Sequence, residues 1–294
     1  MTDEFIQPLL AWYDENKRIL PWRDKKNAYY TWVSEIMLQQ TRVEAVKPYF
    51  ARFIQELPDI PALAACPQEK LLKLWEGLGY YSRVRNMQLA AQEMVEKYNG
   101  KLPEDFSLLL SLKGIGSYTA GAIASIAYGI PVPAVDGNVF RVITRMTEDP
   151  QDIMKPAFRK KTEAMLLEII PKDRPGDFNQ AMMELGAVVC VPNGQPKCDL
   201  CPVRRFCQAR LHGTMENYPV KALGAEPLYI EELPDAKHIF SHIEWRMKGY
   251  LVRVSSLEQT HAQGILFADK KESEKNYAIP SAFGAYVKYM KEEI

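Results

Sequence analysis

The sequence predicts a mainly α-helical protein that ends in a smaller α+β segment, and three observations support this fold class. Apolar residues recur at helical spacing in successive segments between residues 4 and 190. Gly114 and Gly116 separate two of these segments, a pattern typical of a helix, a tight hairpin and a second helix. Beyond residue 218 the composition changes, and residues 237–254 alternate apolar with polar side chains as strands do.

The N-terminal part is predicted to contain a helix over residues 4–19, a turn, and a long helix over residues 33–54. Glu35 lies in the long helix, close in sequence to Trp32 and Ile36. A carboxylate in such a neighbourhood either faces solvent from the polar side of the helix or lies at a partly dry site. In the second case burial raises its pKa, as a general acid requires.

Two further helices are predicted over residues 68–76 and 80–98, separated by a turn that glycines mark. The second helix opens with Tyr80, Tyr81 and Arg83. An aromatic ring at such a turn can stack on a base while a guanidinium group holds a phosphate, which suits a DNA surface. Core tyrosines and solvated arginines would give the same pattern without a DNA contact.

The segment 112–138 combines the hairpin with a carboxylate. Gly114 and Gly116 allow positive φ at the turn and let backbone N–H groups approach a ligand, and a helix N-terminus follows them. One DNA phosphate is the natural ligand of such a turn, although many plain connections between helices also use glycine. Asp136 precedes a helix predicted over 137–146, either as its N-cap alone or as a functional carboxylate beyond the phosphate site.

Four of the five cysteines fall within eighteen residues, after helices predicted over 155–171 and 177–190. These four are Cys190, Cys198, Cys201 and Cys207. Four thiolates at these spacings can bind one tetrahedral metal ion or one iron–sulfur cube, and the spacing does not separate zinc from iron. Cys66 is predicted to be a buried apolar residue.

The composition is that of an ordinary soluble globular protein, with 294 residues of which 47% are hydrophobic and 25% charged. The 37 basic and 37 acidic residues balance, so a nucleic-acid contact must come from a local basic face. Candidate faces contain Arg83 with Arg85, or Arg204 with Arg205 and Arg210. No apolar run approaches the length of a membrane span and the acidic start lacks a signal-peptide pattern, so we expect a cytoplasmic protein without a membrane partner.

Several motifs together resemble the helix-hairpin-helix DNA glycosylases, and in particular the MutY-type adenine DNA glycosylases. The motifs are SEIMLQQTRV, GLGYYSRVRN, LKGIGSYTAGAI, VPAVDGNV and the four-cysteine loop. The resemblance covers roughly residues 4–220 and implies a helical glycosylase core over residues 1–220. A six-helix barrel-like lobe would span about 28–133 and include the hairpin at 107–128. A cluster lobe would combine residues 1–27 and 134–220.

The resemblance also implies roles for individual residues. Glu35 would be the acid that protonates adenine, and Asp136 would stabilise the sugar cation, with Tyr118 and Asn138 orienting these groups. The expected DNA contacts are Gln40 as a wedge in the base stack, Tyr80 beside the oxidised guanine, Arg83, and the hairpin glycines Gly114 and Gly116. The expected cofactor is a [4Fe–4S] cluster on the four cysteines, although this chain has one residue more between the first two than the commonest family pattern.

The C-terminal part resembles the end of the family's Nudix-like domain. We expect a linker over 221–236 and a truncated Nudix-like segment over 237–294, with a short strand at 264–268 and a helix at 282–292. The resemblance implies that Ser241 and His242 help to read the oxidised guanine. About half of that domain is missing, and half a sheet leaves an unpaired edge and an open core, so we expect a poorly stable or rearranged tail, or one that pairs with another chain.

The expected function is that of a monofunctional adenine DNA glycosylase in base excision repair, a monomer in the bacterial cytosol. It would hydrolyse the N-glycosidic bond of adenine opposite 8-oxoguanine or guanine in double-stranded DNA. A competing hypothesis is a glycosylase/lyase of the endonuclease III type, whose Schiff-base lysine corresponds here to Tyr118, while Lys113 precedes the hairpin. The sequence also allows a noncatalytic DNA-binding iron–sulfur protein or a four-cysteine zinc protein.

Overall fold

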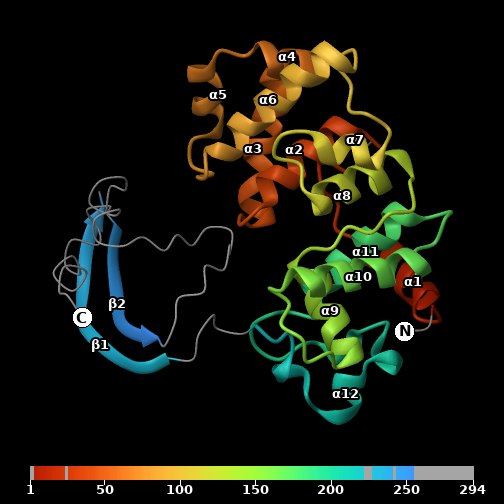
Figure 1. The fold of residues 1–294 in the computed structure, drawn as a ribbon, viewed down its shortest axis with the longest axis vertical. Helices are drawn as coiled ribbons and strands as arrows, with labels where there is room; N and C mark the ends of the chain where they lie inside the picture. Colours follow the sequence, from red (N-terminus) through yellow and green to blue (C-terminus); the bar gives the residue numbers. More distant parts are fainter. Residues whose placement is uncertain (1–2, 24–25, 222–226, 241–242, 255–294) are drawn as a thin grey trace. The chain divides into compact units, whose positions relative to one another are not determined.

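The computed structural model describes residues 3–23, 26–221, 227–240 and 243–254. The chain divides into two units, Met1–Val220 and Lys221–Ile294, and each is described by itself. The described residues of the first unit form α-helices and short 3-10 helices, which confirms the mainly α prediction. These helices gather into two lobes (Figure 1), and each lobe has its own cluster of buried apolar side chains.

The first lobe contains the hairpin and the helix that carries Glu35. Its helices are α2 (Ala28–Leu38), α3 (Val43–Glu56), α4 (Ile60–Ala65), α5 (Gln68–Trp75), α6 (Ser82–Lys97), α7 (Phe106–Ser111) and α8 (Ser117–Tyr128). The rings of Phe53 and Trp75 meet nearly edge to face in the core, 6.0 Å apart. The hairpin prediction is confirmed, because α7 and α8 flank a turn that contains both glycines.

The second lobe combines the N-terminal helix with the chain after residue 134. Its α-helices are α1 (Ile6–Asn16), α9 (Gly137–Thr147), α10 (Pro156–Ile169), α11 (Pro175–Val188) and α12 (Gln208–His212). The 3-10 helices lie in and after the cysteine loop and are η1 (Cys198–Leu200), η2 (Arg204–Phe206) and η3 (Met215–Asn217). The predicted helices over 155–171 and 177–190 therefore correspond to α10 and α11.

The single long helix predicted over 33–54 is wrong, because the chain breaks between α2 and α3. Gln40 lies at this break with a φ of 59°, in the left-handed region that ends a helix. The guanidinium group of Arg83 supports the break, since its Nη1 donates to the carbonyl oxygens of Ile36 and Gln39, each at 2.7 Å. These carbonyls at the end of α2 find their partner 44 or more residues away, which no local pattern could indicate.

The predicted lobe boundary at residue 27 also needs correction. Leu20 and Trp22 belong to the buried cluster of the first lobe, whereas α1 packs in the second. Trp22 contacts the ring of Phe50 edge to face, with 5.3 Å between the ring centroids. The chain therefore enters the first lobe directly after α1, because these two large apolar side chains are buried there.

In the described part of the second unit, β1 (Pro227–Phe240) and β2 (Ile243–Val254) pair as an antiparallel sheet. β1 begins inside the stretch predicted as a linker over 221–236, and the stretch predicted as one strand over 237–254 belongs to two strands. The register shifts between Leu233 and Ala236, where Pro234 lacks an N–H for the ladder. Because proline is rare inside strands, Pro234 argues against a strand when the sequence is considered alone.

Several sequence predictions for the tail lie outside the described residues. These are Ser241, His242, the strand at 264–268 and the helix at 282–292. The structure therefore leaves the Nudix-like resemblance as an expectation. Among the helices of the described part of the chain, none is both long and apolar enough to cross a membrane.

We predict that hydrogen exchange will show weak protection of the backbone amides in β1 and β2. A sheet of two strands buries little apolar surface, so these amides should exchange on the order of 100-fold or more faster than those of α8. The measurement is exchange detected by mass spectrometry or NMR on protein whose mass in solution is that of a monomer. Strong protection of both strands in such a monomer would contradict the expected instability of the tail.

Candidate active site

Glu35 lies in the last turn of α2 and is only 8% exposed, so it does not lie on a solvated face of the helix. Burial raises the pKa of Glu35 from an ordinary value of 4.5 to about 7, and the charge of Asp136 acts in the same direction. The hydrogen bond from Tyr118 and the charge of Arg23 lower this pKa in part. Near neutral pH the Glu35 carboxyl group can therefore either hold or release a proton.

Tyr118 connects the hairpin to Glu35. It lies in the first turn of α8, and its hydroxyl group donates a hydrogen bond to Glu35 Oε2. Burial raises the pKa of Tyr118 well above its ordinary value, so the hydroxyl keeps its proton and remains a donor. The hydroxyl also lies 3.7 Å from the sulfur of Met183 on α11. The hydrogen bond from Tyr118 thus fixes Oε2 of Glu35, and Oε1 does not take part in it.

Asp136 caps α9 and also faces the Glu35 site, so the capping role and the functional role of this residue are compatible. Its Oδ1 accepts the Val139 N–H at 2.8 Å, which confirms the predicted N-cap. Its Oδ2 accepts a hydrogen bond from Asn138 Nδ2 at 2.7 Å. Burial raises the pKa of Asp136, whereas these hydrogen bonds oppose that rise. The structure therefore brings the predicted site residues Glu35, Asp136, Tyr118 and Asn138 together at the junction of the lobes.

Asn138 is itself held by neighbours on α9 and α11. Its Oδ1 accepts from Arg141 Nη2 at 2.8 Å, and the same guanidinium nitrogen donates to the Gly186 carbonyl at 2.8 Å. A Cβ atom at Gly186 would lie 2.6 Å from the Asn138 Cβ, so only glycine lets α11 approach this closely. Asn138 consequently holds the Asp136 carboxylate from a rigid position.

Arg23 is a site residue that no sequence motif indicated. It acts on the pKa of both Glu35 and Tyr118, and its Nη2 donates to Glu184 Oε2 at 3.1 Å. Glu184 is 1% exposed and also pairs with Arg18, and although burial raises its pKa, the arginines hold it below its ordinary value. The sequence shows Arg23 only as part of a turn after Pro21 and Trp22, which does not assign it to a site.

Gln40 and Tyr80 share an unusual backbone conformation. Their φ angles are 59° and 46°, and Tyr80 is 60% exposed. The sequence suggested Arg83 as a DNA contact, but its guanidinium group binds the turn that contains Gln40 and the turn that contains Tyr80. Its Nη2 donates to the carbonyl oxygens of Leu78 and Gly79 at 3.0 and 3.2 Å, while its Nη1 holds the end of α2. The two terminal nitrogens of Arg83 therefore hold the backbone directly before Gln40 and Tyr80 and are engaged within the protein.

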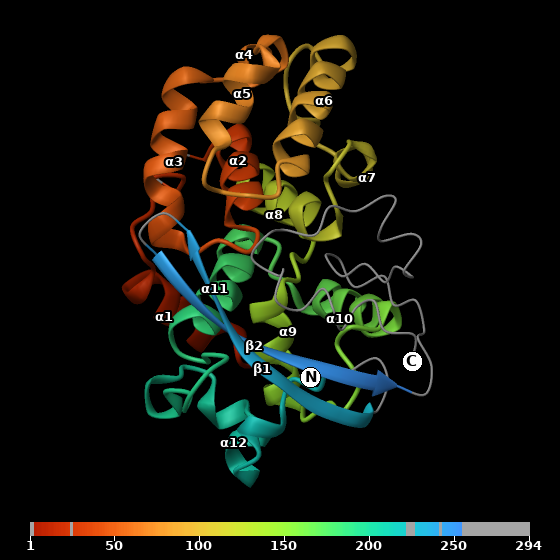
Figure 2. The same ribbon diagram turned by 90° about the vertical axis from the view of Figure 1, so that its left-hand side faces the viewer.

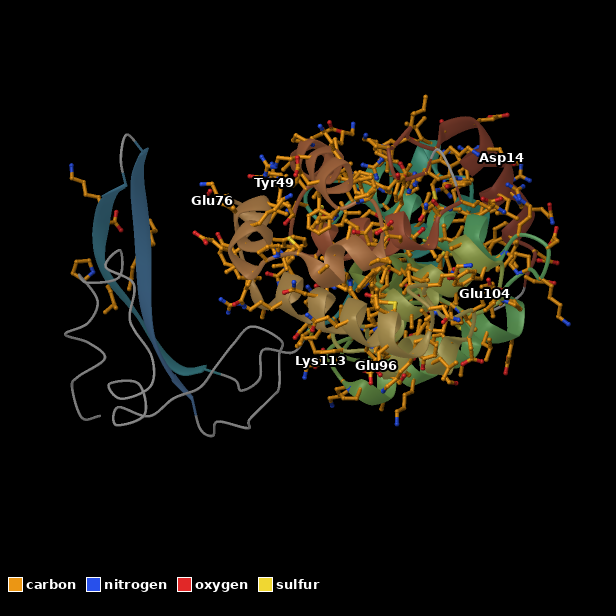
Figure 3. All side chains as sticks on the ribbon, turned by 90° about the horizontal axis from the view of Figure 1, so that it is seen from above. Asp14, Tyr49, Glu76, Glu96, Glu104 and Lys113 are labelled. Carbon is orange, nitrogen blue, oxygen red and sulfur yellow. The ribbon has the colours of Figure 1, made fainter. Side chains whose placement is uncertain are left out.

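The hairpin uses its two glycines differently. Gly114 has a φ of 78°, whereas Gly116 is extended with a φ of −92° and is the N-cap residue of α8, so only Gly114 requires positive φ. A Cβ atom at Gly116 would meet open space, which leaves the N-terminus of α8 accessible. Lys113 is exposed, and Figure 3 shows it at the outer edge of the unit.

The four cysteines of the loop line one common cavity. Cys190, Cys198, Cys201 and Cys207 all line it, together with Arg145, Arg204 and Arg210 among others. Arg145 Nη1 donates to the Cys190 sulfur at 3.3 Å. Within the described residues, no three His, Cys, Asp or Glu side chains are placed to hold a single metal ion. Cys66 is 6% exposed, which confirms that it is buried away from this loop.

The fold and the site together define a class of protein. Two helical lobes meet at two carboxylates, the buried Glu35 and the partly buried Asp136. A hairpin with an open helix N-terminus and a four-cysteine loop flank them on either side. This combination is that of a helix-hairpin-helix protein with a carboxylate site between its lobes.

Comparisons with known proteins agree with this class. Residues 33–172 match the model of the HhH-GPD superfamily base excision DNA repair protein. The chain is 44% identical over 215 residues to the adenine DNA glycosylase of Homo sapiens, covering 70% of this chain and 39% of that protein. It is 40% identical over 218 residues to the adenine DNA glycosylase of Buchnera aphidicola subsp. Acyrthosiphon pisum, covering 74% and 62%.

A solved structure shows the same fold. The non-covalent Endonuclease III–DNA complex aligns with a TM-score of 0.60 at 24% identity, covering 72% of this chain and 98% of that one. The match of residues 33–172 to the HhH-GPD superfamily model agrees with the family that the sequence motifs indicated. The chain spans 39% of the human relative and 62% of the Buchnera relative.

We predict that Glu35→Gln will stabilise the protein above neutral pH. Because the folded pKa of Glu35 is raised from 4.5 to about 7, the protonated form stabilises the parent fully below pH 4.5, and this stability is lost as the pH rises through 7. The glutamine variant has no such loss. Its advantage in the free energy of unfolding should grow over this pH range to at most ~3 kcal/mol. Denaturant titration at several pH values tests this, and an advantage that is constant with pH would contradict the raised pKa.

Proposed function

We propose that the protein is an adenine DNA glycosylase that hydrolyses the N-glycosidic bond of adenine opposite 8-oxoguanine or guanine in double-stranded DNA. The observation that carries this proposal is the pair of the buried Glu35 and the partly buried Asp136, with the pKa of Glu35 raised to about 7. The identity of 40–44% to proteins named adenine DNA glycosylase supports the same activity. A sugar-bond hydrolase needs one carboxyl group as an acid and another as a stabiliser of positive charge.

In the first step the adenine nucleotide leaves the base stack and enters the site. The protonated Glu35 gives its proton to adenine N7. The C–N bond then breaks, its electron pair stays with the protonated base, and adenine leaves as a neutral molecule. A pKa of about 7 leaves a large fraction of Glu35 protonated at neutral pH. Tyr118, which donates to Glu35 Oε2, holds that carboxyl group in place during the transfer.

In the second step the carboxylate of Asp136 stabilises the positive charge that develops on the sugar, either electrostatically or by brief covalent attachment. The hydrogen bonds from Asn138 and the Val139 N–H keep this carboxylate directed and oppose its protonation. Water then attacks the sugar and gives its proton to Glu35, which restores the acid. No lysine is required, so the reaction ends at the abasic site.

Several DNA contacts in this proposal come from the first lobe. The backbone N–H groups at the hairpin around Gly114 and Gly116 would bind one phosphate at the open N-terminus of α8. Gln40 and Tyr80, whose preceding carbonyl groups are both held by Arg83, would enter the base stack. Residues with such unusual backbone conformations cluster at functional sites. We further propose that Ser241 and His242 contribute to reading the oxidised base, and that the protein acts as a cytoplasmic monomer.

The four cysteines fit a [4Fe–4S] cluster in their chemistry, because four thiols on one cavity are the ligand set that such a cluster takes. Cys190, Cys198, Cys201 and Cys207 would hold it. The cluster would supply structural support to the loop rather than a redox step. Arg204 and Arg210, which line the same cavity, would thereby be fixed on a surface that can face phosphates.

We predict fast single-turnover release of adenine from a duplex with adenine opposite 8-oxoguanine, slower release opposite guanine, and none opposite thymine. Glu35→Gln should lower release by at least ~100-fold while DNA binding stays nearly intact, because the variant keeps the size of the side chain but not the acid. Gel separation of alkali-treated products measures release. Equal rates for the first two duplexes would contradict discrimination of the oxidised base.

Two outcomes of this assay would support a different function. No release from any duplex with intact DNA binding would indicate a noncatalytic binding protein. Strand cleavage without alkali would indicate a glycosylase/lyase, and Lys113→Ala would show whether the exposed Lys113 is its nucleophile.

We predict that anaerobically purified protein will be brown, with visible absorbance from an iron–sulfur cluster. Substitution of Cys198 by Ser should remove most of this absorbance, whereas Cys66→Ser should leave it unchanged because Cys66 lies in the core of the other lobe. Metal analysis accompanies the spectrum. A colourless protein that contains zinc would contradict the cluster.

A further inference from the structure

We propose that Arg159 and Glu163 on α10 are positioning residues that hold Asp136 in place relative to the hairpin. This inference rests on the proposed function, in which the hairpin binds a phosphate and Asp136 acts on the sugar. α10 supplies none of the expected catalytic residues. In both Figure 1 and Figure 2 it lies close to α9 and below α8.

Arg159 contacts the chain on both sides of Asp136. Its Nη1 donates to the carbonyl oxygen of Val135, the residue directly before Asp136, at 2.9 Å. Its guanidinium carbon lies 4.9 Å from the ring centroid of Phe140 in the first turn of α9. The Phe140 N–H in turn donates to the Asp136 carbonyl at 3.0 Å. One guanidinium group therefore restrains the backbone that presents the Asp136 carboxylate.

Glu163 extends this restraint to the hairpin. It lies one turn after Arg159 on α10, and its Oε1 is 3.6 Å from Arg159 Nη1. The same oxygen accepts a hydrogen bond from the Ser117 hydroxyl at 2.9 Å. Ser117 is the first residue of α8 and directly follows Gly116. A continuous set of contacts thus runs from the proposed phosphate site through α10 to Asp136.

The chain itself connects these two points through α8 and the segment that follows it. Between the end of α8 and the start of α9, residues 129–136 form no regular element. Small displacements of a reacting group cost large factors in rate, so a second connection between the hairpin and Asp136 is useful for catalysis. The Arg159 and Glu163 side chains are 40% and 26% exposed, and such pairs contribute little to overall stability. The role that we propose for this pair is therefore to position Asp136 and the hairpin, not to stabilise the fold.

The test compares Arg159→Met with Lys161→Met in the full chain. Lys161 is a matched control, because it lies on the same helix and its Nζ pairs with Asp149 at 2.6 Å, away from Val135 and Ser117. Three quantities are measured: single-turnover adenine release at saturating enzyme, DNA affinity as a function of salt, and hydrogen exchange of the Val139 and Phe140 amides.

We expect Arg159→Met to release adenine about 10- to 100-fold more slowly than the parent, with unchanged DNA affinity and salt dependence. The Val139 and Phe140 amides should exchange faster, because their acceptors are on Asp136. Lys161→Met should match the parent in all three measurements. Arg159→Lys, which keeps a donor for Val135, should recover part of the rate, and Glu163→Gln should show a smaller loss than Arg159→Met.

The positioning role is overturned if Arg159→Met weakens DNA binding and reduces its salt dependence while the rate at saturation stays that of the parent. That result would make Arg159 a phosphate contact. Parent-like exchange of the two amides would also overturn it. If the parent protein releases no adenine, the proposed function fails, and the exchange comparison still decides whether Arg159 restrains Asp136.

Discussion

The architecture depends on the close passage of the chain between α8 and α11. A Cβ atom at Gly121 would lie 2.2 Å from the Pro133 carbonyl oxygen, so the segment after α8 contacts the helix backbone itself. Asn179 on α11 fastens this segment from the other side, since its side chain binds the Ala134 N–H at 3.0 Å and the Val132 carbonyl at 2.9 Å. Because Asp136 follows directly, this crossing sets how near it comes to Glu35.

Two carboxyl groups at one dry junction create the electrostatics that the proposed reaction needs. Burial and the charge of Asp136 raise the pKa of Glu35, and the charge of Arg23 opposes them only in part. Arg23 is also committed to Glu184, which shares its charge with two arginines. Burial raises the pKa of both carboxyl groups, but Asp136 accepts hydrogen bonds from Asn138 and from the Val139 N–H that oppose this rise, whereas Glu35 accepts one from Tyr118. The two groups are thus suited to opposite roles, one as an acid and one as an anion.

Several arginines around this site form hydrogen bonds inside the protein. Arg83 holds the turns of Gln40 and Tyr80, and Arg141 joins Asn138 to the backbone of Cys190 at 2.8 Å. Arg145 then contacts the Cys190 sulfur from the same helix, so α9 extends from the carboxylate site to the cysteine loop. Arg83, Arg141 and Arg145 therefore bind groups within the protein. The formal net charge of the chain is zero, so there is no excess of basic residues to indicate a DNA surface.

The sequence alone determined most of the helices, the hairpin, the N-cap at Asp136 and the burial of Cys66, because each depends on local periodicity or on side chains a few residues apart. Only the tertiary structure decided that α2 ends at Leu38, since Arg83 supplies the donors for its last carbonyls from another helix. The burial of Glu35 was likewise open, because its partners Tyr118 and Asp136 are distant in sequence. A carboxyl pKa depends on the charges and solvent around it in space, and only folding brings those groups together.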